Sequence, residues 1–525
     1  MLIFTFTISV LLMILLPVVA GGIFRSRSQA PWMLFIAGTV TFIGSQVVHL
    51  PLNSLLADWH VLPQNGLSDP AIPVAQTAII AGLTAGLCEE TARLAGYWLL
   101  RKARSLEDGI MLGLGHGGIE SMIFGGVLTA ATISSLLPLI GTDLAALKLT
   151  PEQMEALTQQ LNLLTVSPIA GAAAPLVERL LAMTLHVVLS VLVLQAVRRR
   201  NPLYYLAAVA YHALVDTGAV YTRTLSLDAY QLELLLALMV LPGLAWLVWM
   251  WRREARPWAN SGQAQPAQQQ WDLFLAAIRK EVLQQWRTQR FLVVMAVFVL
   301  FGLTSPLVAK YTPEIIKSIA GAQQFAALIP TPSSADAVGQ YIKNITQFGF
   351  LLAVLLGMNA VAGEKESGTA AMILSKPMPR WAFALSKFCA QMVVFASAFS
   401  VAGLGAYYYT LILFGAFDPW RFAGINLLLF AWLLPFVAAA LLGSVIGRSV
   451  AAAAGIGVVI SVAILAAGSI PQYGALFPSG LLAWAAALGG SAGQAGANAG
   501  ALAASLVLVV LCLLWSVALF ERQEI

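Results

Sequence analysis

The chain has 525 residues, of which 59% are hydrophobic and only 10% charged, and its mean hydropathy is +0.82. Soluble domains carry roughly 25% charged residues, so this composition excludes a soluble globular protein and predicts a polytopic protein embedded in a lipid bilayer. The net charge of +5 does not indicate nucleic-acid binding, because basic residues of membrane proteins collect in cytoplasmic loops.

Apolar runs long enough to cross a bilayer follow one another along the chain. A membrane helix needs about 20 apolar residues, and about thirteen such runs occur, seven before residue 252 and six after residue 288. This pattern predicts an all-α fold with two helical bundles. The runs lie near residues 2–23, 31–51, 73–100, 108–138, 173–197, 203–221, 231–251, 291–309, 344–362, 382–415, 422–446, 450–470 and 500–520.

The basic residues cluster between alternate runs. If the N-terminus lies outside and the helices alternate, most of the 29 Lys and Arg residues fall on the cytoplasmic side. The positive-inside rule therefore predicts an N-out, C-in orientation in the plasma membrane.

A polar segment separates the two halves. Residues 252–270 are rich in Gln and carry two prolines, which is typical of a solvated cytoplasmic linker. We therefore predict one membrane domain over residues 1–251 and a second over residues 271–525. No sequence repeat relates the halves, which disfavours an inverted-repeat transporter.

Ionisable residues lie inside three of the apolar runs of the first half. Such groups cost about 2.5–3.5 kcal/mol each at membrane depth, so they usually serve a function. Within each run they are spaced three or four residues apart, which places them on one helical face. The seven residues are Glu89, Glu90 and Arg93, His116 and Glu120, and His212 and Asp216.

Hydrolysis is the chemistry that uses this set of side chains. A carboxylate can act as the general base on water, an arginine can hold a neighbouring carboxylate ionised, and a histidine can polarise a carbonyl or protonate a leaving amine. The glycines around His116 allow close helix packing and leave room for water or a substrate backbone. The structural alternative is a set of ion pairs that only lock helices together.

Three motifs carry a family resemblance. EETAR, GLGHGGIE and HALVD, in this order and on separate runs, resemble the motifs of YhfC-type intramembrane peptidases, distant relatives of the CAAX-protease and bacteriocin-processing (CPBP) family. The resemblance covers about residues 1–250 and implies an endopeptidase in which Glu89 activates water. It further implies supporting roles for Glu90 and Arg93, orienting roles for His116 and His212, and a polar partner role for Asp216. Two residues separate Glu90 from Arg93, whereas the wider CPBP pattern has three.

The sequence is compatible with both a metal-dependent and a metal-free site. Some relatives are called metalloproteases, and zinc accepts imidazole nitrogen and carboxylate oxygen. The HExxH spacing is absent, so a glutamate-type and a zinc-dependent mechanism both remain. The candidate ligands are His116, Glu120, His212 and Asp216. We interpret Glu178, Arg179 and His186 as an interface or snorkelling group, and His49 and His60 as ordinary residues near the surface.

The second half begins with an amphipathic segment. Residues 271–290 place Trp271, Phe274 and Ile278 on one face, with basic residues largely on the other, which predicts a helix in the cytoplasmic membrane interface. A cytoplasmic segment, GEKESGTAAMILSKPMPR, follows the second run of this half. In it, Gly368 and two prolines bracket a short predicted helix.

This order resembles the permease subunit of type-2 ABC exporters, which have an elbow helix, six spans and an E-x-x-x-G-T coupling segment. The matching residues are Glu364 or Glu366, Gly368, Thr369, Pro377, Pro379 and Arg380. The resemblance implies a separate ATPase partner and a homodimer or heterodimer of permease domains. The chain has no P-loop motif, so it has no ATPase activity of its own.

The combined prediction is a membrane protein that processes and/or exports a hydrophobic or peptide substrate. A transport-only or immunity protein, in which the first bundle is a non-catalytic binding or regulatory domain, is the alternative. A secondary transporter with a Glu/His proton relay is a third reading.

Overall fold

The structure, a computed structural model, describes residues 2–524 except 29, 64–71, 141, 143–150, 166–167, 223–224, 226, 255–266, 319–330, 472 and 491–496. Most of the predicted linker, 255–266, therefore lies outside the described residues. The fold divides into two compact units, Met1–Ala130 with Leu139–Gly262, and Ala131–Pro138 with Gln263–Ile525. We describe each by itself.

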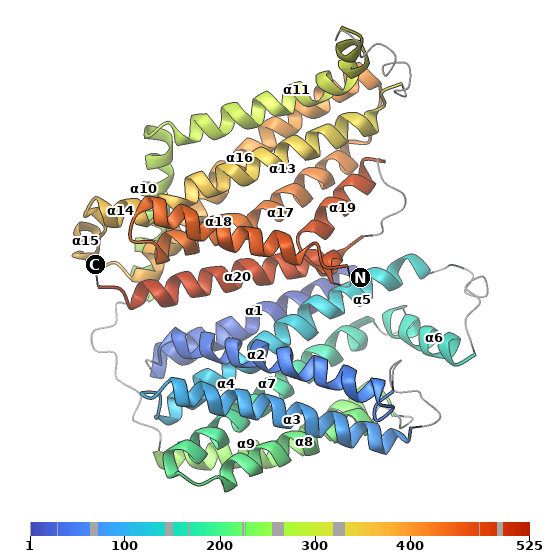
Figure 1. Ribbon diagram of the computed structural model, residues 1–525, viewed down its shortest axis with the longest axis vertical. Helices are drawn as coiled ribbons and strands as arrows, with labels where there is room; N and C mark the ends of the chain where they lie inside the picture. Colours follow the sequence, from blue (N-terminus) through green and yellow to red (C-terminus); the bar gives the residue numbers. More distant parts are fainter. Residues whose placement is uncertain are drawn as a thin grey trace. The chain divides into compact units, whose positions relative to one another are not determined.

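Every regular element among the described residues is a helix (Figure 1). The first half contains α1 Leu2–Ser28, α2 Trp32–Asp58, α3 Val74–Leu99, α4 Leu106–Glu120, η1 Ser121–Leu128, α5 Thr129–Leu136, η2 Leu137–Leu139, α6 Pro151–Thr165, α7 Pro168–Arg199, α8 Leu203–Thr222 and α9 Ala229–Glu254. The second half contains α10 Ala267–Arg287, α11 Arg290–Ser318, α13 Ser334–Met358, α14 Ala362–Glu366, α15 Thr369–Leu374, α16 Arg380–Phe414, α17 Pro419–Ile446, α18 Val450–Ala467, η4 Gly474–Leu476, α19 Ser479–Leu488 and α20 Ala499–Glu521.

Eleven helical stretches among the described residues are long and apolar enough to cross a membrane. The prediction of an all-α, multi-pass membrane protein is therefore confirmed. Helices α3 and α8, which we also expected to cross, contain 26 and 20 residues but do not belong to this set. Helix α3 carries three charged residues near its middle, which lowers its hydropathy. The count of thirteen spans and the N-out orientation stay predictions.

Small residues let the helices of the first unit approach closely. Helix α2 packs on α4 and α3, while α3 packs on α8, and α7 contacts α4 and α8. At the α2–α4 crossing, a Cβ on Gly115 would overlap the backbone of Phe35, and one on Gly38 would overlap the Leu112 carbonyl. This contact places His116 beside α2 and α3, because only glycine fits between the two backbones.

We expect Gly115→Ala to destabilise the first unit by about 1–3 kcal/mol, because the added methyl forces two helix backbones apart. Thermal unfolding of the purified chain in detergent measures the effect. The control is Gly44→Ala on α2, where a Cβ would meet nothing within 4 Å. Equal melting temperatures for both variants would contradict the close approach.

The core of the second unit is rich in phenylalanine. Phe298 of α11 lies 5.0 Å from Phe399 and 6.0 Å from Phe395 of α16, measured between ring centroids. Helix α10 packs on α16, where Phe274 lies 5.2 Å from the Trp381 ring. The amphipathic segment is thus a helix that packs against the N-terminal part of α16. Its location in the membrane interface stays a prediction.

Candidate functional site

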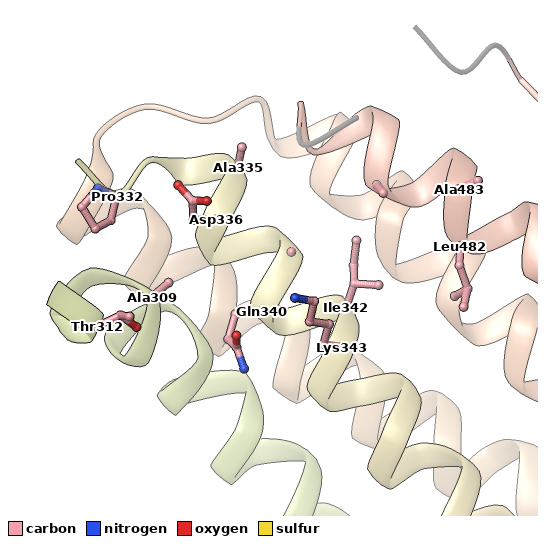
Figure 2. A pocket seen from close by; sticks show the side chains of 12 residues that line it. Ala309, Thr312, Pro332, Ala335, Asp336, Gln340, Ile342, Lys343, Leu482 and Ala483 are labelled. Atoms are coloured by element: carbon pink, nitrogen blue, oxygen red, sulfur yellow. The ribbon is translucent and has the colours of Figure 1, made fainter. Parts of the chain in front are cut away.

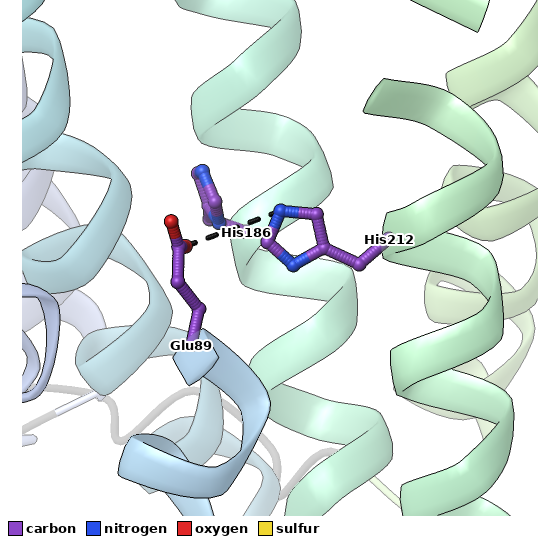
Figure 3. Close-up of side chains that lie close together, drawn as sticks. All are labelled: Glu89, His186 and His212. Atoms are coloured by element: carbon purple, nitrogen blue, oxygen red, sulfur yellow. Dashed lines mark ion pairs between the residues drawn. The ribbon is translucent and has the colours of Figure 1, made fainter. Parts of the chain in front are cut away.

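Four helices of the first unit bring acidic, basic and imidazole side chains into one buried cluster. Figure 3 shows Glu89, His186 and His212 pointing toward one another from α3, α7 and α8. His116 joins them from α4, and all four side chains are buried. The convergence that the sequence pattern requires is therefore present in the structure.

Glu89 lies at the centre of the cluster. Its Oε2 is 3.0 Å from His116 Nε2 and 4.0 Å from His212 Nε2. The same oxygen is 3.8 Å from Arg93 Nη2. Its Oε1 accepts a hydrogen bond of 3.3 Å from the Gln46 side chain on α2. Glu89 thus faces two imidazoles and a cation at once.

Glu90 and Arg93 form a supporting pair behind Glu89. Arg93 Nη1 donates to Glu90 Oε1, and Arg93 Nη2 lies 2.5 Å from His186 Nδ1. The three-residue spacing between Glu90 and Arg93 is thus compatible with a direct ion pair. Glu90 Oε1 also lies 2.7 Å from His212 Nδ1, which leaves His212 Nε2 facing the cluster.

His186 occupies a position that sequence reasoning missed. We interpreted it as part of an interface group, but its Nε2 contacts Glu120 Oε2. Its ring centroid is 5.1 Å from that of His116 and 5.4 Å from that of His212. A histidine in the middle of an apolar run was the signal, and the two charged residues about two turns before it on α7 obscured it.

Arg179 on α7 does form the expected interface pair. It donates to Glu120 Oε1 at 2.9 Å and to Glu178 Oε1 at 2.8 Å. Glu120 therefore bridges Arg179 and His186, at the edge of the cluster rather than beside Glu89.

The remaining candidates are His116, inside the cluster, and Asp216, at its edge. His116 Nδ1 is 3.0 Å from Thr41 Oγ1, which fixes the ring while Nε2 faces Glu89. Asp216 Oδ2 is 3.4 Å from His212 Nε2, and its side chain is 36% exposed. Asp216 thus stands where the cluster meets the surface of the unit.

Local sequence signals position α4. Ser105 and Asp108 form a capping box that starts this helix, with the side chain of each accepting from a backbone N–H of the other. The helix widens into the π-helical turn η1 immediately after Glu120. Such turns often occur at functional sites, because they rotate the side chains that follow.

The cluster offers a ligand set that fits zinc. One donor atom each of Glu89, His186 and His212 lie within 4.8 Å of one another, and two imidazoles with one carboxylate are a common set in catalytic zinc sites. Glu90 would orient His212 as carboxylates do behind metal-binding histidines. Among the described residues, Glu90 Oε2 has no hydrogen-bond partner, so the site has spare acceptor capacity. His186 has to release Arg93 or Glu120 to bind a metal.

The second unit contains a buried ionic network at the expected coupling segment. Lys387 of α16, only 2% exposed, lies 2.9 Å from Glu364 and 3.0 Å from Glu281. Lys280 pairs with the same two carboxylates, at 3.1 Å and 2.8 Å. Burial lowers the pKa of Lys280, but hydrogen bonds and charges from Glu281 and Glu364 outweigh it and raise the pKa above its usual value. The network joins α10, α14 and α16 around a cavity of about 250 Å³.

The other residues of the predicted coupling segment lie in the turns that connect α14, α15 and α16. Gly368, with φ of 72°, separates α14 from α15, which begins at Thr369. Glu366 accepts from the backbone N–H of Val450, at 3.0 Å. Pro377 and Pro379 precede α16, whose first residue, Arg380, donates to the Phe520 carbonyl at 3.1 Å.

A larger cavity of about 690 Å³ lies between α11, α13 and α19 (Figure 2). Its polar lining comes mainly from Asp336, Gln340 and Lys343 of α13, and Leu482 supplies an apolar wall.

The two units thus define an integral multi-pass membrane protein, one unit with a buried glutamate–histidine–arginine cluster and the other with a buried lysine–glutamate network. The family model described as YhfC intramembrane metalloprotease matches residues 12–250. The model described as ABC-2 family transporter protein matches residues 275–525. Each half of the chain thus matches one family model, and both predicted resemblances are confirmed.

Two curated relatives come from Bacillus subtilis (strain 168). The uncharacterized transmembrane protein YxlG is 32% identical over 210 residues, which are 40% of this chain and 79% of the relative. The uncharacterized membrane protein YhfC is 26% identical over 237 residues, which are 45% of this chain and 90% of the relative.

Proposed function

We propose that the first half is an intramembrane endopeptidase and that the second half is an exporter permease driven by a separate ATPase. Together they process and/or export a hydrophobic or peptide substrate at the plasma membrane. The observation that supports the hydrolytic half best is the contact of Glu89 with His116 and His212 inside a buried cluster. The domain limits that we propose are residues 1–251 and 271–525.

Glu89 has the geometry of a general base. Its carboxylate takes a proton from water, and the water oxygen attacks the scissile carbonyl carbon. His212, whose Nε2 faces the cluster, orients the water or the oxyanion that forms, and Arg93 supports the Glu89 carboxylate from behind. The proton then passes to the leaving amine as the C–N bond breaks. His116, held by Thr41, keeps the Glu89 carboxylate in place.

The same residues suit a metal-dependent route. A divalent metal held by Glu89, His186 and His212 would supply Lewis-acid polarisation of the carbonyl. In that arrangement His116, 3.0 Å from Glu89, would serve as a base beside the metal, and Glu90 and Arg93 would orient the ligands. Hydrolysis of a peptide bond is the outcome of either route.

We expect the purified chain to contain about one zinc ion. His212→Ala should lose most of it, because a three-ligand site loses a third of its donors, whereas Glu178→Gln should keep it. Elemental analysis by mass spectrometry after gel filtration measures the ratio. Metal-free wild-type protein that still cuts peptides would remove the metal route and leave the glutamate route.

The permease proposal predicts that a P-loop ATPase purifies with the full chain in mild detergent. Gly368→Val should reduce its recovery severalfold, because a β-branched residue at φ of 72° strains the corner between α14 and α15. Gly339→Ala is the control, since a Cβ there meets nothing within 4 Å. Recovery of no ATPase with the wild-type chain would contradict the permease proposal.

One observation favours the alternative of a non-catalytic first bundle. Arg93 holds both Glu90 and His186, as a network that only locks helices together would. In that case the chain is a transport-only or immunity protein, and substitution of Glu89 leaves its cellular role unchanged.

A further inference from the structure

A row of polar side chains leads away from Glu89 along α2. Gln46, which donates to Glu89, is followed by His49 and Asn53 at steps of three and four residues. These steps keep all three on one side of the helix. Asn53 lies about 10 Å further along the axis than Gln46, toward the Asp58 end of α2.

The row is linked by hydrogen bonds and faces α3. His49 Nε2 is 3.2 Å from Thr84 Oγ1 on α3, and Asn53 Nδ2 is 3.0 Å from His49 Nε2. His49 is therefore no ordinary surface residue, in contrast to its interpretation from the sequence.

Two atoms of the row are buried without a partner among the described residues. They are His49 Nδ1 and Asn53 Oδ1. When Asn53 Nδ2 donates to His49 Nε2, the imidazole proton must sit on Nδ1, where it finds no protein acceptor. Buried polar atoms of this kind are normally satisfied by water. The opposite face of α2 is apolar and exposed, with Val48 60% exposed, as suits a surface against lipid.

We propose that Gln46, His49, Asn53 and Thr84 form a hydrated path that delivers water to Glu89 from the Asp58 end of α2. Its use in hydrolysis rests on the function proposed above. Gln46 stands at the inner end, where its amide donates to the carboxylate that would activate the water. A site enclosed by lipid and packed helices needs such a path, because water is the second substrate of every turnover.

Thiol reactivity tests the path independently of catalysis. In a background that lacks Cys88, Cys389 and Cys512, single cysteines replace His49 or its neighbour Val48. The full chain is placed in lipid nanodiscs and treated with a charged, water-soluble methanethiosulfonate. We expect His49→Cys to react about tenfold or more faster than Val48→Cys, because only a hydrated thiol ionises readily.

A second pair leaves the three polar residues of α2 unchanged. Thr84→Cys should likewise react faster than Leu83→Cys, whose side chain is 50% exposed toward the lipid side. Equally slow reaction within both pairs would overturn the path, even if the protein cuts peptides. If His49→Cys does not fold, the Thr84 pair decides alone.

The rate of peptide hydrolysis provides a second test of the hydrated path. Asn53→Leu should slow peptide hydrolysis severalfold, whereas Ser54→Leu, on the exposed side of the same turn, should not. Hydrated thiols in a chain that cuts nothing would keep the path and remove the hydrolase proposal. An unchanged rate in Asn53→Leu, together with slow thiol labelling, would remove the path and keep the hydrolase.

Discussion

Replacing Glu89 with glutamine should lower the rate of peptide hydrolysis by about 10²–10⁴-fold, which is the usual contribution of a general base. Glutamine has nearly the same shape and can still accept from Gln46, but it cannot take a proton from water. Cleavage of a fluorogenic peptide by the chain in nanodiscs measures the rate. The variant should elute and melt like the wild type, because glutamine keeps the side-chain volume and buried Arg93 retains its ion pair with Glu90.

The matched control is Glu178→Gln. Glu178 is a half-buried glutamate that pairs with Arg179 at 2.8 Å, outside the cluster. Its loss should leave the rate within about twofold, since a partly exposed ion pair contributes only about 0–1 kcal/mol. Equal losses in both variants would mean that the glutamates act through stability and not through chemistry.

The second large effect should follow from Lys387→Met. This ammonium lies within 3.0 Å of both Glu281 and Glu364 and is almost fully buried. Without it, two carboxylates share the remaining, half-exposed Lys280, so the second unit should lose about 3–5 kcal/mol. Thermal unfolding of the full chain measures the shift.

Further substitutions within the same ionic network should restore the lost stability. Lys387→Met combined with Glu281→Gln and Glu364→Gln removes the uncompensated charges and should recover most of the loss. Lys376→Met, which changes an exposed lysine, should alter stability by no more than about 0.5 kcal/mol. A Lys387→Met chain as stable as the wild type would show that the network contributes little.

The site could be predicted where polar residues interrupt apolar helices. Glu89, His116 and His212 each stand out because ionisable groups are costly at membrane depth. His186 and Gln46 did not stand out for different reasons. His186 follows two charged residues that offered a simpler explanation, and Gln46 is a neutral amide without a motif. Which face of α7 or α2 meets protein cannot be read from an apolar pattern, because lipid and protein both accept apolar side chains.

In the predicted coupling segment, too, the sequence predicts the local helix but not the long-range contacts. Gly368 and the prolines predicted a short helix, and α15 occupies that place. The partners of Lys387 could not be predicted, because Glu281 lies 106 residues away in sequence. Contacts at such a separation depend on how the helices pack, and spacing rules reach only one or two helical turns.

The most direct test of the central claim is hydrolysis in water enriched in ¹⁸O. The purified chain in nanodiscs is incubated with membrane-spanning peptides, and the fragments are analysed by mass spectrometry. The account predicts fragments whose new carboxyl group carries one ¹⁸O, and it predicts their loss in Glu89→Gln. The absence of labelled fragments from the wild type, or their equal yield from the variant, would contradict a hydrolytic site at Glu89.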